Sequence, residues 1–170
     1  MNPIEGQIDI DLYPDNNHGV RADIHSTRPL QASQVMVGKS PEEALSLIPL
    51  LYNVCAIAQA RTSLRAIQDQ LEICPTPAEE FARDMLVLVE NAREHLFRVL
   101  VDWPRLFALK QDEQPLSLLG RLIPECKQAL FEDGNAFALD SQLQVDRTAV
   151  INLIDELDDR LQQAVFQRPI

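Results

Sequence analysis

Residues that commonly carry metal or redox chemistry are scarce in this sequence. Three cysteines, Cys55, Cys74 and Cys126, and three histidines occur among 170 residues. An odd number of widely spaced cysteines suits neither a disulfide framework nor a four-cysteine zinc site, so we expect reduced thiols. The sequence also lacks a glycine-rich phosphate loop, a Cys-x-x-Cys pair, a His-x-x-x-His pair and a nucleophile elbow. Self-contained hydrolase, kinase and dinucleotide-dependent chemistries therefore have no support.

Long apolar runs are missing, and basic residues are in the minority. No run approaches the roughly 18 to 20 apolar residues that a membrane span needs, and the first residues do not resemble a signal peptide. The 26 acidic and 15 basic residues give a net charge of −11, which disfavours binding to phosphate backbones and anionic lipids. We therefore expect a cytoplasmic protein that binds neither nucleic acid nor membranes.

The composition is that of a folded protein, because 46% of the residues are hydrophobic and can form a core. We expect one domain over residues 1–170, with strands in 1–38 and mostly helices in 40–170. The expected fold class is α+β, with an N-terminal β-hairpin or small antiparallel sheet packed on a mainly helical bundle.

Alternating apolar and polar residues near the start predict the hairpin. The period of two runs through residues 4–12 and returns in residues 20–24. Residues 14–19 supply turn chemistry between these runs, so the two runs should pair as antiparallel strands. A short third strand is predicted at Gln34–Val37, before Gly38.

Beyond Gly38 the apolar residues take the period of helices. The segments Ser40-Pro41-Glu42-Glu43 and Thr76-Pro77-Ala78-Glu79 each place a capping hydroxyl before a proline and three residues before a glutamate, which is a capping box. Asp146 is a third capping residue. The predicted helices are 40–71, 76–103, 116–131, which should be kinked or split at Gly120 and Pro124, and one that begins after Asp146.

Two of these helices carry an apolar stripe. We predict that the chain self-associates or binds a partner through the last helix, because its stripe must be covered. The stripe of the helix at 76–103 consists of Phe81, Met85, Leu88, Val89, Ala92, Leu96, Val99 and Leu100, and that of the last helix of Val150, Leu153, Ile154, Leu157, Leu161, Ala164 and Val165.

Cys55 differs from the other two cysteines in its neighbours. In a continuous first helix, Tyr52, Cys55 and Gln59 lie at positions i, i+3 and i+7 and project from one side. This spacing can present a thiolate, a phenol and an amide to one ligand, although many helices contain such triples. Cys74 and Cys126 are expected to be small hydrophobic residues of the core.

Several segments together resemble the large subunit of nickel–iron hydrogenases. Pro3-Ile4-Glu5-Gly6-Gln7 is similar to the Arg-Ile-Glu-Gly-His strand of that family, and Gly38-Lys39-Ser40-Pro41 to its Gly-Arg-x-Pro helix start. Within the family motif Arg-x-Cys-Gly-x-Cys-x-x-x-His, Cys55 matches the second cysteine, which bridges nickel and iron. Tyr52 stands in place of the first cysteine and Gln59 in place of the histidine. The resemblance implies the fold of the N-terminal half of such a subunit, with Glu5 near the same pocket.

The substitutions change what the resemblance implies about activity. Nickel in that family is held by soft thiolates, and a phenol with a pKa near 10 is a poor replacement. The Cys-x-x-Cys pair near the C-terminus of the family is missing from these 170 residues. We therefore expect no nickel, no catalytic residue and no hydrogenase activity.

The segments Ser26-Thr27-Arg28-Pro29, Asn91-Ala92-Arg93-Glu94-His95 and Asp102-Trp103-Pro104 look like HupK-type hydrogenase accessory proteins, degenerate relatives of the large subunit. This resemblance implies a non-catalytic role in hydrogenase maturation, in which Cys55 transiently holds an iron carbonyl–cyanide fragment. The alternative is a metal-free docking chaperone or large-subunit mimic that binds maturation factors. The implied partners are hydrogenase maturation proteins, the hydrogenase large subunit, or both. The match covers the N-terminal half of the family alone, which implies a truncated or split member.

Overall fold

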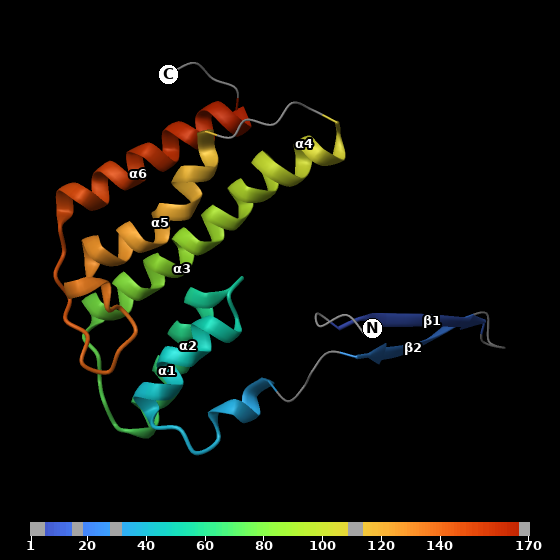
Figure 1. Cartoon of the computed structure of the whole chain (residues 1–170), viewed down its shortest axis with the longest axis horizontal. Coiled ribbons are helices and arrows are strands. Elements are labelled where there is room, and N and C mark those ends of the chain that lie inside the picture. The colour runs from blue at the N-terminus through green and yellow to red at the C-terminus, as the bar shows by residue number, and fades with distance from the viewer. Residues whose placement is uncertain (1–5, 15–18, 28–31, 109–113, 167–170) are drawn as a thin grey trace. The chain divides into compact units, whose positions relative to one another are not determined.

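The computed structural model describes residues 6–14, 19–27, 32–108 and 114–166; of residues 32, 114–116, 164 and 165 it describes the backbone alone. The chain divides into two compact units, Met1–Lys39 and Ser40–Ile170, which are described separately (Figure 1). Strands lie in the first unit and the long helices in the second, so the α+β class is confirmed. That the two units form one domain stays a prediction.

The first unit contains the predicted β-hairpin. Strands β1 (Ile8–Pro14) and β2 (Val20–Ser26) are antiparallel, and their register pairs Ile10 with Ile24 and Leu12 with Ala22. Because side chains alternate along a strand, this register gathers the apolar residues of both strands on one face. The hairpin and its two apolar runs are therefore confirmed.

The predicted third strand at Gln34–Val37 is wrong. Residues Ala32–Met36 form the 3₁₀ helix η1. The backbone N–H of Val37 donates to the carbonyl of Gln34 at 3.1 Å, and that of Lys39 to the carbonyl of Met36 at 3.1 Å. These local bonds use donors that a strand would give to a neighbour, and Gly38, with φ of +81°, then turns the chain.

The second unit is helical, and its helix starts follow the sequence closely. Ser40 and Thr76 both form the predicted capping boxes, with Glu43 and Glu79 as their partners. Asp146 accepts a hydrogen bond from the backbone of Ala149 at 3.0 Å. The elements are α1 (Pro41–Leu51), α2 (Ala56–Gln70), α3 (Pro77–Phe97), the π-helical turn η2 (Arg98–Asp102), α4 (Trp103–Leu106), α5 (Gln114–Leu130), the 3₁₀ turn η3 (Glu132–Gly134), α6 (Arg147–Leu161) and the π-helical turn η4 (Gln162–Phe166).

Three predicted helices differ from the observed ones. The α-helix expected at 76–103 ends at Phe97, and the chain continues through η2 and α4 to Leu106, because Pro104 can occupy the first turn of α4. The helix expected from Ser40 to about Leu71 is broken into α1 and α2, for a reason given below. The helix expected to be kinked or split at Gly120 and Pro124 is the continuous α5, so it is not split, while a kink stays a prediction. Pro124 cannot donate to the carbonyl of residue i−4, which is Gly120, and both residues are exposed, so water can satisfy that carbonyl.

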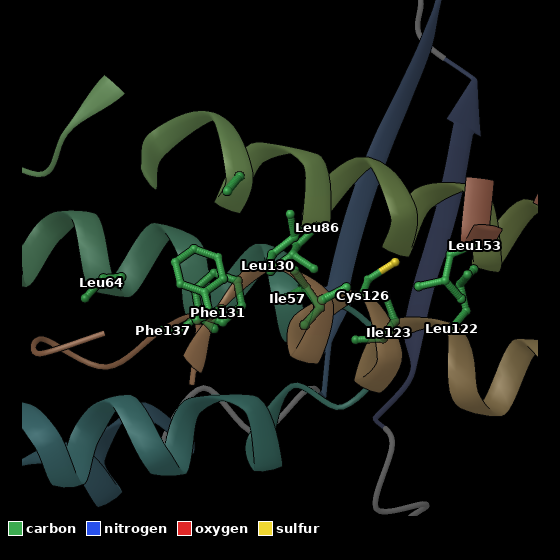
Figure 2. Packing of buried hydrophobic residues seen from close by; sticks show 14 of the residues in the cluster. Ile57, Leu64, Leu86, Leu122, Ile123, Cys126, Leu130, Phe131, Phe137 and Leu153 are labelled. Carbon is green, nitrogen blue, oxygen red and sulfur yellow. The ribbon is translucent and has the colours of Figure 1, made fainter. Parts of the chain in front are cut away.

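Helices α2, α3, α5 and α6 share one hydrophobic core with parts of α1 and of the 131–143 segment (Figure 2). The predicted stripe of α3 is out of phase with the buried face over its first half. Phe81 and Leu88 are 68% and 66% exposed, whereas Ala82 and Leu86, which lie outside the predicted stripe, are buried; Leu96, in the second half of the stripe, is buried as predicted. The core side of α3 also carries two charged residues, Arg83 and Glu90, which an apolar count does not select.

Helix α6 packs on α5, and Leu153 is its buried residue. Val150 and Leu157 pack against the core, while Ile154 remains 48% exposed. Much of the apolar stripe is thus covered within the chain, and association through α6 stays a prediction. Among the helices of the described ranges, none is long and apolar enough to cross a membrane.

Candidate functional site

Cys55 lies in the short connection between α1 and α2. The N–H of Tyr52, at the end of α1, donates to the carbonyl of Ile48 at 3.1 Å, and the N–H of Cys55 donates to the carbonyl of Tyr52 at 3.1 Å. The carbonyl of Cys55 then accepts the N–H of Gln59 at 3.0 Å, which is the first bond of α2. We call residues 52–55 the Cys55 turn.

A buried carboxylate from α3 explains why the helix breaks at this turn. In a continuous helix the N–H groups of Ile57 and Ala58 would donate to the carbonyls of residues 53 and 54. They donate instead to Oε1 and Oε2 of Glu90, at 2.8 and 3.0 Å. Cys55, at the N-cap position, offers no side-chain cap, so Glu90 replaces the usual local cap.

The environment of Glu90 suits this role. Glu90 is 3% exposed, and its negative charge lies at the positive N-terminal end of the α2 dipole. Both of its oxygens are used by the two amides, so the carboxylate is held in one orientation. The sequence offered no clear sign of this residue, because Glu90 follows Leu88 and Val89 in a helix with many surface acids.

The structure places three of the four predicted site residues around the Cys55 turn. Their expected place on one continuous helix is wrong, because Tyr52 ends α1, Cys55 precedes α2 and Gln59 lies in the first turn of α2. The side-chain amide of Gln59 lies 3.9 Å from Cys55 Sγ, within reach of a weak N–H···S hydrogen bond. Glu5 lies outside the described residues.

The other thiols do not share this site. Cys126 is buried, and burial, with a smaller contribution from Glu125, raises the pKa of its thiol to about 11. Cys74 is exposed, contrary to the expectation that it belongs to the core, and lies beyond the opposite end of α2. The 15 residues of α2 span about 22 Å at a rise of about 1.5 Å per residue, so Cys55 and Cys74 cannot bind one ion together.

The donors around Cys55 do not form a complete metal site. Among the described residues, no group of three or more histidine, cysteine, aspartate and glutamate side chains is positioned to hold one metal ion. Cys55 is exposed and is a free thiol. A metal bound there would have to bring most of its ligands with it.

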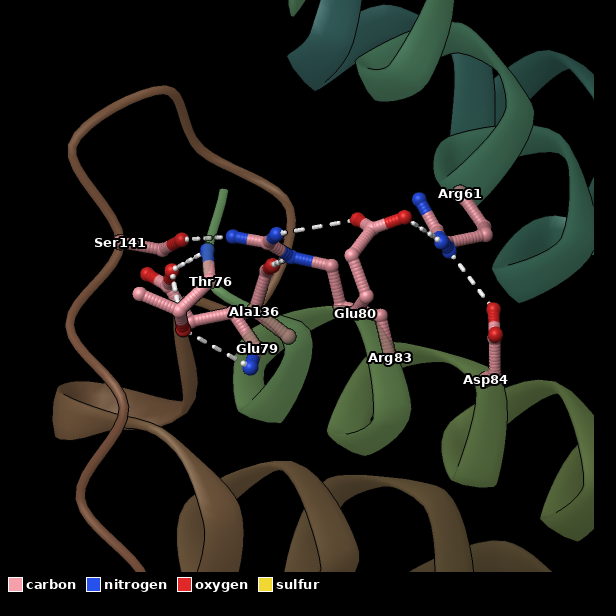
Figure 3. Close-up of polar contacts among 8 residues, drawn as sticks. All are labelled: Arg61, Thr76, Glu79, Glu80, Arg83, Asp84, Ala136 and Ser141. Atoms are coloured by element: carbon pink, nitrogen blue, oxygen red, sulfur yellow. Dashed lines mark hydrogen bonds and ion pairs between the residues drawn. The ribbon is translucent and has the colours of Figure 1, made fainter. Parts of the chain in front are cut away.

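An ionic network centred on the buried Arg61 and Arg83 joins α2 and α3 (Figure 3). Arg61 of α2 donates to Glu80 at 2.6 Å and to Asp84 at 2.9 Å, both on α3. Burial disfavours the charged form of Arg61, but the hydrogen bonds and charges of Glu80 and Asp84 outweigh this effect and raise its pKa. The network thus holds α2, and with it the Cys55 turn, against α3.

Arg83 extends the network to the 131–143 segment. Its guanidinium donates to the carbonyl of Ala136 at 2.9 Å and to Ser141 Oγ at 2.7 Å, and it lies 3.7 Å from Glu80. It also lies over the ring of Phe131, 5.6 Å from the centroid. Arg83 is 1% exposed, so it fixes an irregular segment to α3 from inside the fold.

Comparisons with known proteins connect this chain to hydrogenase accessory proteins. It is 38% identical over 82 residues to hydrogenase expression/formation protein HupV of Azotobacter chroococcum, an alignment that covers 48% of this chain and 24% of that protein. It is 33% identical over 108 residues to HupK of Azotobacter vinelandii, covering 63% and 30% of the two chains. An uptake hydrogenase large subunit of Afipia carboxidovorans is 25% identical over 126 residues, covering 71% and 21%.

These alignments span less than a third of each relative. No family model matches the sequence, and no solved structure matches it significantly. The chain is therefore similar to proteins named for hydrogenase expression and formation, over about a quarter to a third of their length.

Proposed function

We propose that the chain is a non-catalytic accessory protein in the maturation of nickel–iron hydrogenase and that Cys55 transiently holds an iron carbonyl–cyanide fragment. The observation that carries the proposal is the similarity to HupV and HupK, together with an exposed thiol at the position where the large-subunit motif has its bridging cysteine. The partners would be maturation proteins, the hydrogenase large subunit, or both.

The geometry supports a temporary holder rather than a permanent metal site. A carbonyl–cyanide fragment supplies most of its own ligands, so one thiolate can suffice to retain it. Thiolate is a soft ligand that suits low-valent iron, and Gln59, 3.9 Å from the sulfur, can donate a hydrogen bond to a bound ligand. Tyr52 begins the Cys55 turn, and its carbonyl accepts the N–H of Cys55. An exposed site also permits transfer to a second protein.

The second candidate function is docking without metal. It is favoured by the lack of a three-residue donor cluster among the described residues. In this case the chain would mimic the large subunit and bind maturation factors, and its net charge of −11 would steer basic surfaces toward it. Retention of iron separates the two functions.

The decisive variant is Cys55→Ser. After anaerobic co-expression with the iron-fragment assembly proteins, the wild-type chain should contain iron and show carbonyl and cyanide stretches in the infrared. Cys55→Ser should lose both signals, because a hydroxyl is a much weaker ligand than a thiolate for soft iron. The matched control is Cys74→Ser, which removes a second exposed thiol and should retain the signals. Equal retention by both variants, or no iron in wild type, would favour metal-free docking.

Nickel should be absent from the same preparations. The chain carries three cysteines, one buried and two at opposite ends of α2, so it cannot surround nickel with thiolates. Metal analysis should find well below one nickel per chain even after growth in excess nickel. One tightly held equivalent that survives gel filtration would contradict this expectation.

A further inference from the structure

A cavity of about 360 Å³ lies within the helical unit. Its walls come from α1, from Lys127 of α5 and from residues 135–140, which follow η3. This volume falls in the range of small-molecule binding sites in proteins. None of its lining residues belongs to the Cys55 turn, so the cavity is independent of the function proposed above.

The walls of the cavity are mixed in character. Leu45 and Phe137 are buried and, with Pro49 and Leu139, provide an apolar surface. Asn135 supplies a side-chain amide, while Glu42 and Asp140 are exposed acidic residues. A ligand that fits these walls needs an apolar body.

Lys127 is the unusual group in this cavity. Lys127 is half-buried, and its ammonium group forms no hydrogen bond or ion pair with any described residue. Burial lowers the pKa of Lys127, and no carboxylate compensates for this effect. The ammonium nitrogen is not fully buried, so it keeps some contact with water, but the partial loss of hydration is costly and no protein group offsets it.

The two acidic residues do not serve as that partner. Neither Glu42 nor Asp140 forms an ion pair with Lys127, although both line the same cavity. Both are exposed, so water screens their charges more strongly than that of Lys127. An anionic group inside the cavity would therefore find one unpaired cation there.

We propose that this cavity binds a small organic carboxylate, with the carboxylate on the Lys127 ammonium group and an aliphatic body against Leu45, Pro49 and Phe137. The ion pair neutralises a charge that has lost part of its hydration and has no partner among the described residues. The apolar body replaces water along the hydrophobic wall.

The test uses 4-methylpentanoate as the probe and 4-methylpentan-1-amine as its charge-reversed control. The chain has three lysines, Lys39, Lys110 and Lys127, so their side-chain signals can be followed by NMR in protein labelled at lysine. The carboxylate should shift the Lys127 signal in a saturable manner and raise its pKa. Lys127→Met keeps the aliphatic stem and should weaken binding at least about tenfold, whereas Lys39→Met should leave the affinity unchanged.

The dependence on pH provides an independent readout. Affinity for the carboxylate should be constant from about pH 6 upward and then fall as the pH rises through the pKa of Lys127, because the ammonium group loses its proton there. Equal binding of the amine, unchanged binding by Lys127→Met, or no saturable shift of Lys127 at millimolar 4-methylpentanoate would each overturn the proposal. Circular dichroism and a thermal melt establish that Lys127→Met is folded; removing an unpaired half-buried charge should not lower its melting temperature.

Discussion

Replacing Arg83 by alanine should lower the free energy of unfolding by about 4 kcal/mol, a large part of the roughly 5–15 kcal/mol that stabilises a typical domain. The substitution leaves the carbonyl of Ala136 and the hydroxyl of Ser141 without their buried donor and removes a positive charge 3.7 Å from Glu80. Each such loss costs about 1–3 kcal/mol, and the empty volume beside Phe131 adds a cavity.

The measurement is urea denaturation followed by circular dichroism. Arg83→Met should destabilise less than Arg83→Ala because it fills the space, and Arg83→Lys should restore part of the stability because it can reach one acceptor. The matched control is Arg65→Ala, which removes an exposed arginine from α2 and should change stability by at most about 0.5 kcal/mol. A similar loss for the Arg65 and Arg83 variants would show that the buried contacts contribute little.

Replacing Glu90 by alanine should lower the free energy of unfolding by about 3 kcal/mol. The amides of Ile57 and Ala58 would lose acceptors at 2.8 and 3.0 Å in a site from which water is largely excluded. Glu90→Gln should cost less. The side-chain oxygen of glutamine can still accept a hydrogen bond from one of the two amides, whereas its NH₂ group cannot accept one from the other.

A local measurement separates capping from a general loss of packing. In hydrogen exchange, the amides of Ile57 and Ala58 should lose more protection in Glu90→Ala than the amide of Leu64 in the middle of α2. Glu94→Ala is the control, since Glu94 lies one turn further along α3 and pairs with Arg93 at 3.2 Å near the surface. That variant should cost less than about 1 kcal/mol. Uniform loss of protection along α2 in Glu90→Ala would contradict the capping role.

The features that the sequence predicted are those encoded by neighbouring residues. The hairpin follows from strict alternation on both strands, and its register brings Ile10 opposite Ile24. The capping boxes at Ser40 and Thr76 need residues three positions apart, so they can be recognised without tertiary information. Asp146 acts in the same local way at the start of α6.

The features that the sequence did not predict depend on distant residues. The break between α1 and α2 requires Glu90, which lies 33 residues beyond Ile57. The buried face of α3 includes Arg83 because Ser141 and Ala136 satisfy its guanidinium from a segment more than 50 residues away. Counting apolar residues alone excludes a charged residue whose partners are distant in the sequence, so the predicted stripe of α3 had the wrong phase over its first half.

The candidate site was predicted in part for the same reason. Spacing and resemblance selected Cys55, Tyr52 and Gln59, and the structure gathers them around one turn. Their arrangement on a single helix was wrong because the residue that shapes the turn belongs to α3. The exposure of Cys74, which was expected in the core, follows from its place in the loop after α2 rather than from its residue type.

The distant cap of α2 also orders the events of folding. Helix α3 can begin at its own capping box, whereas the first amides of α2 find their acceptors once Glu90 is in place. A 15-residue helix is marginal by itself in water, so α2 should become stable together with its docking on α3. During synthesis Cys55 emerges from the ribosome before Glu90 does. The thiol therefore acquires its final surroundings after α3 has been made, and a newly made N-terminal segment cannot yet present it in the form found in the complete fold.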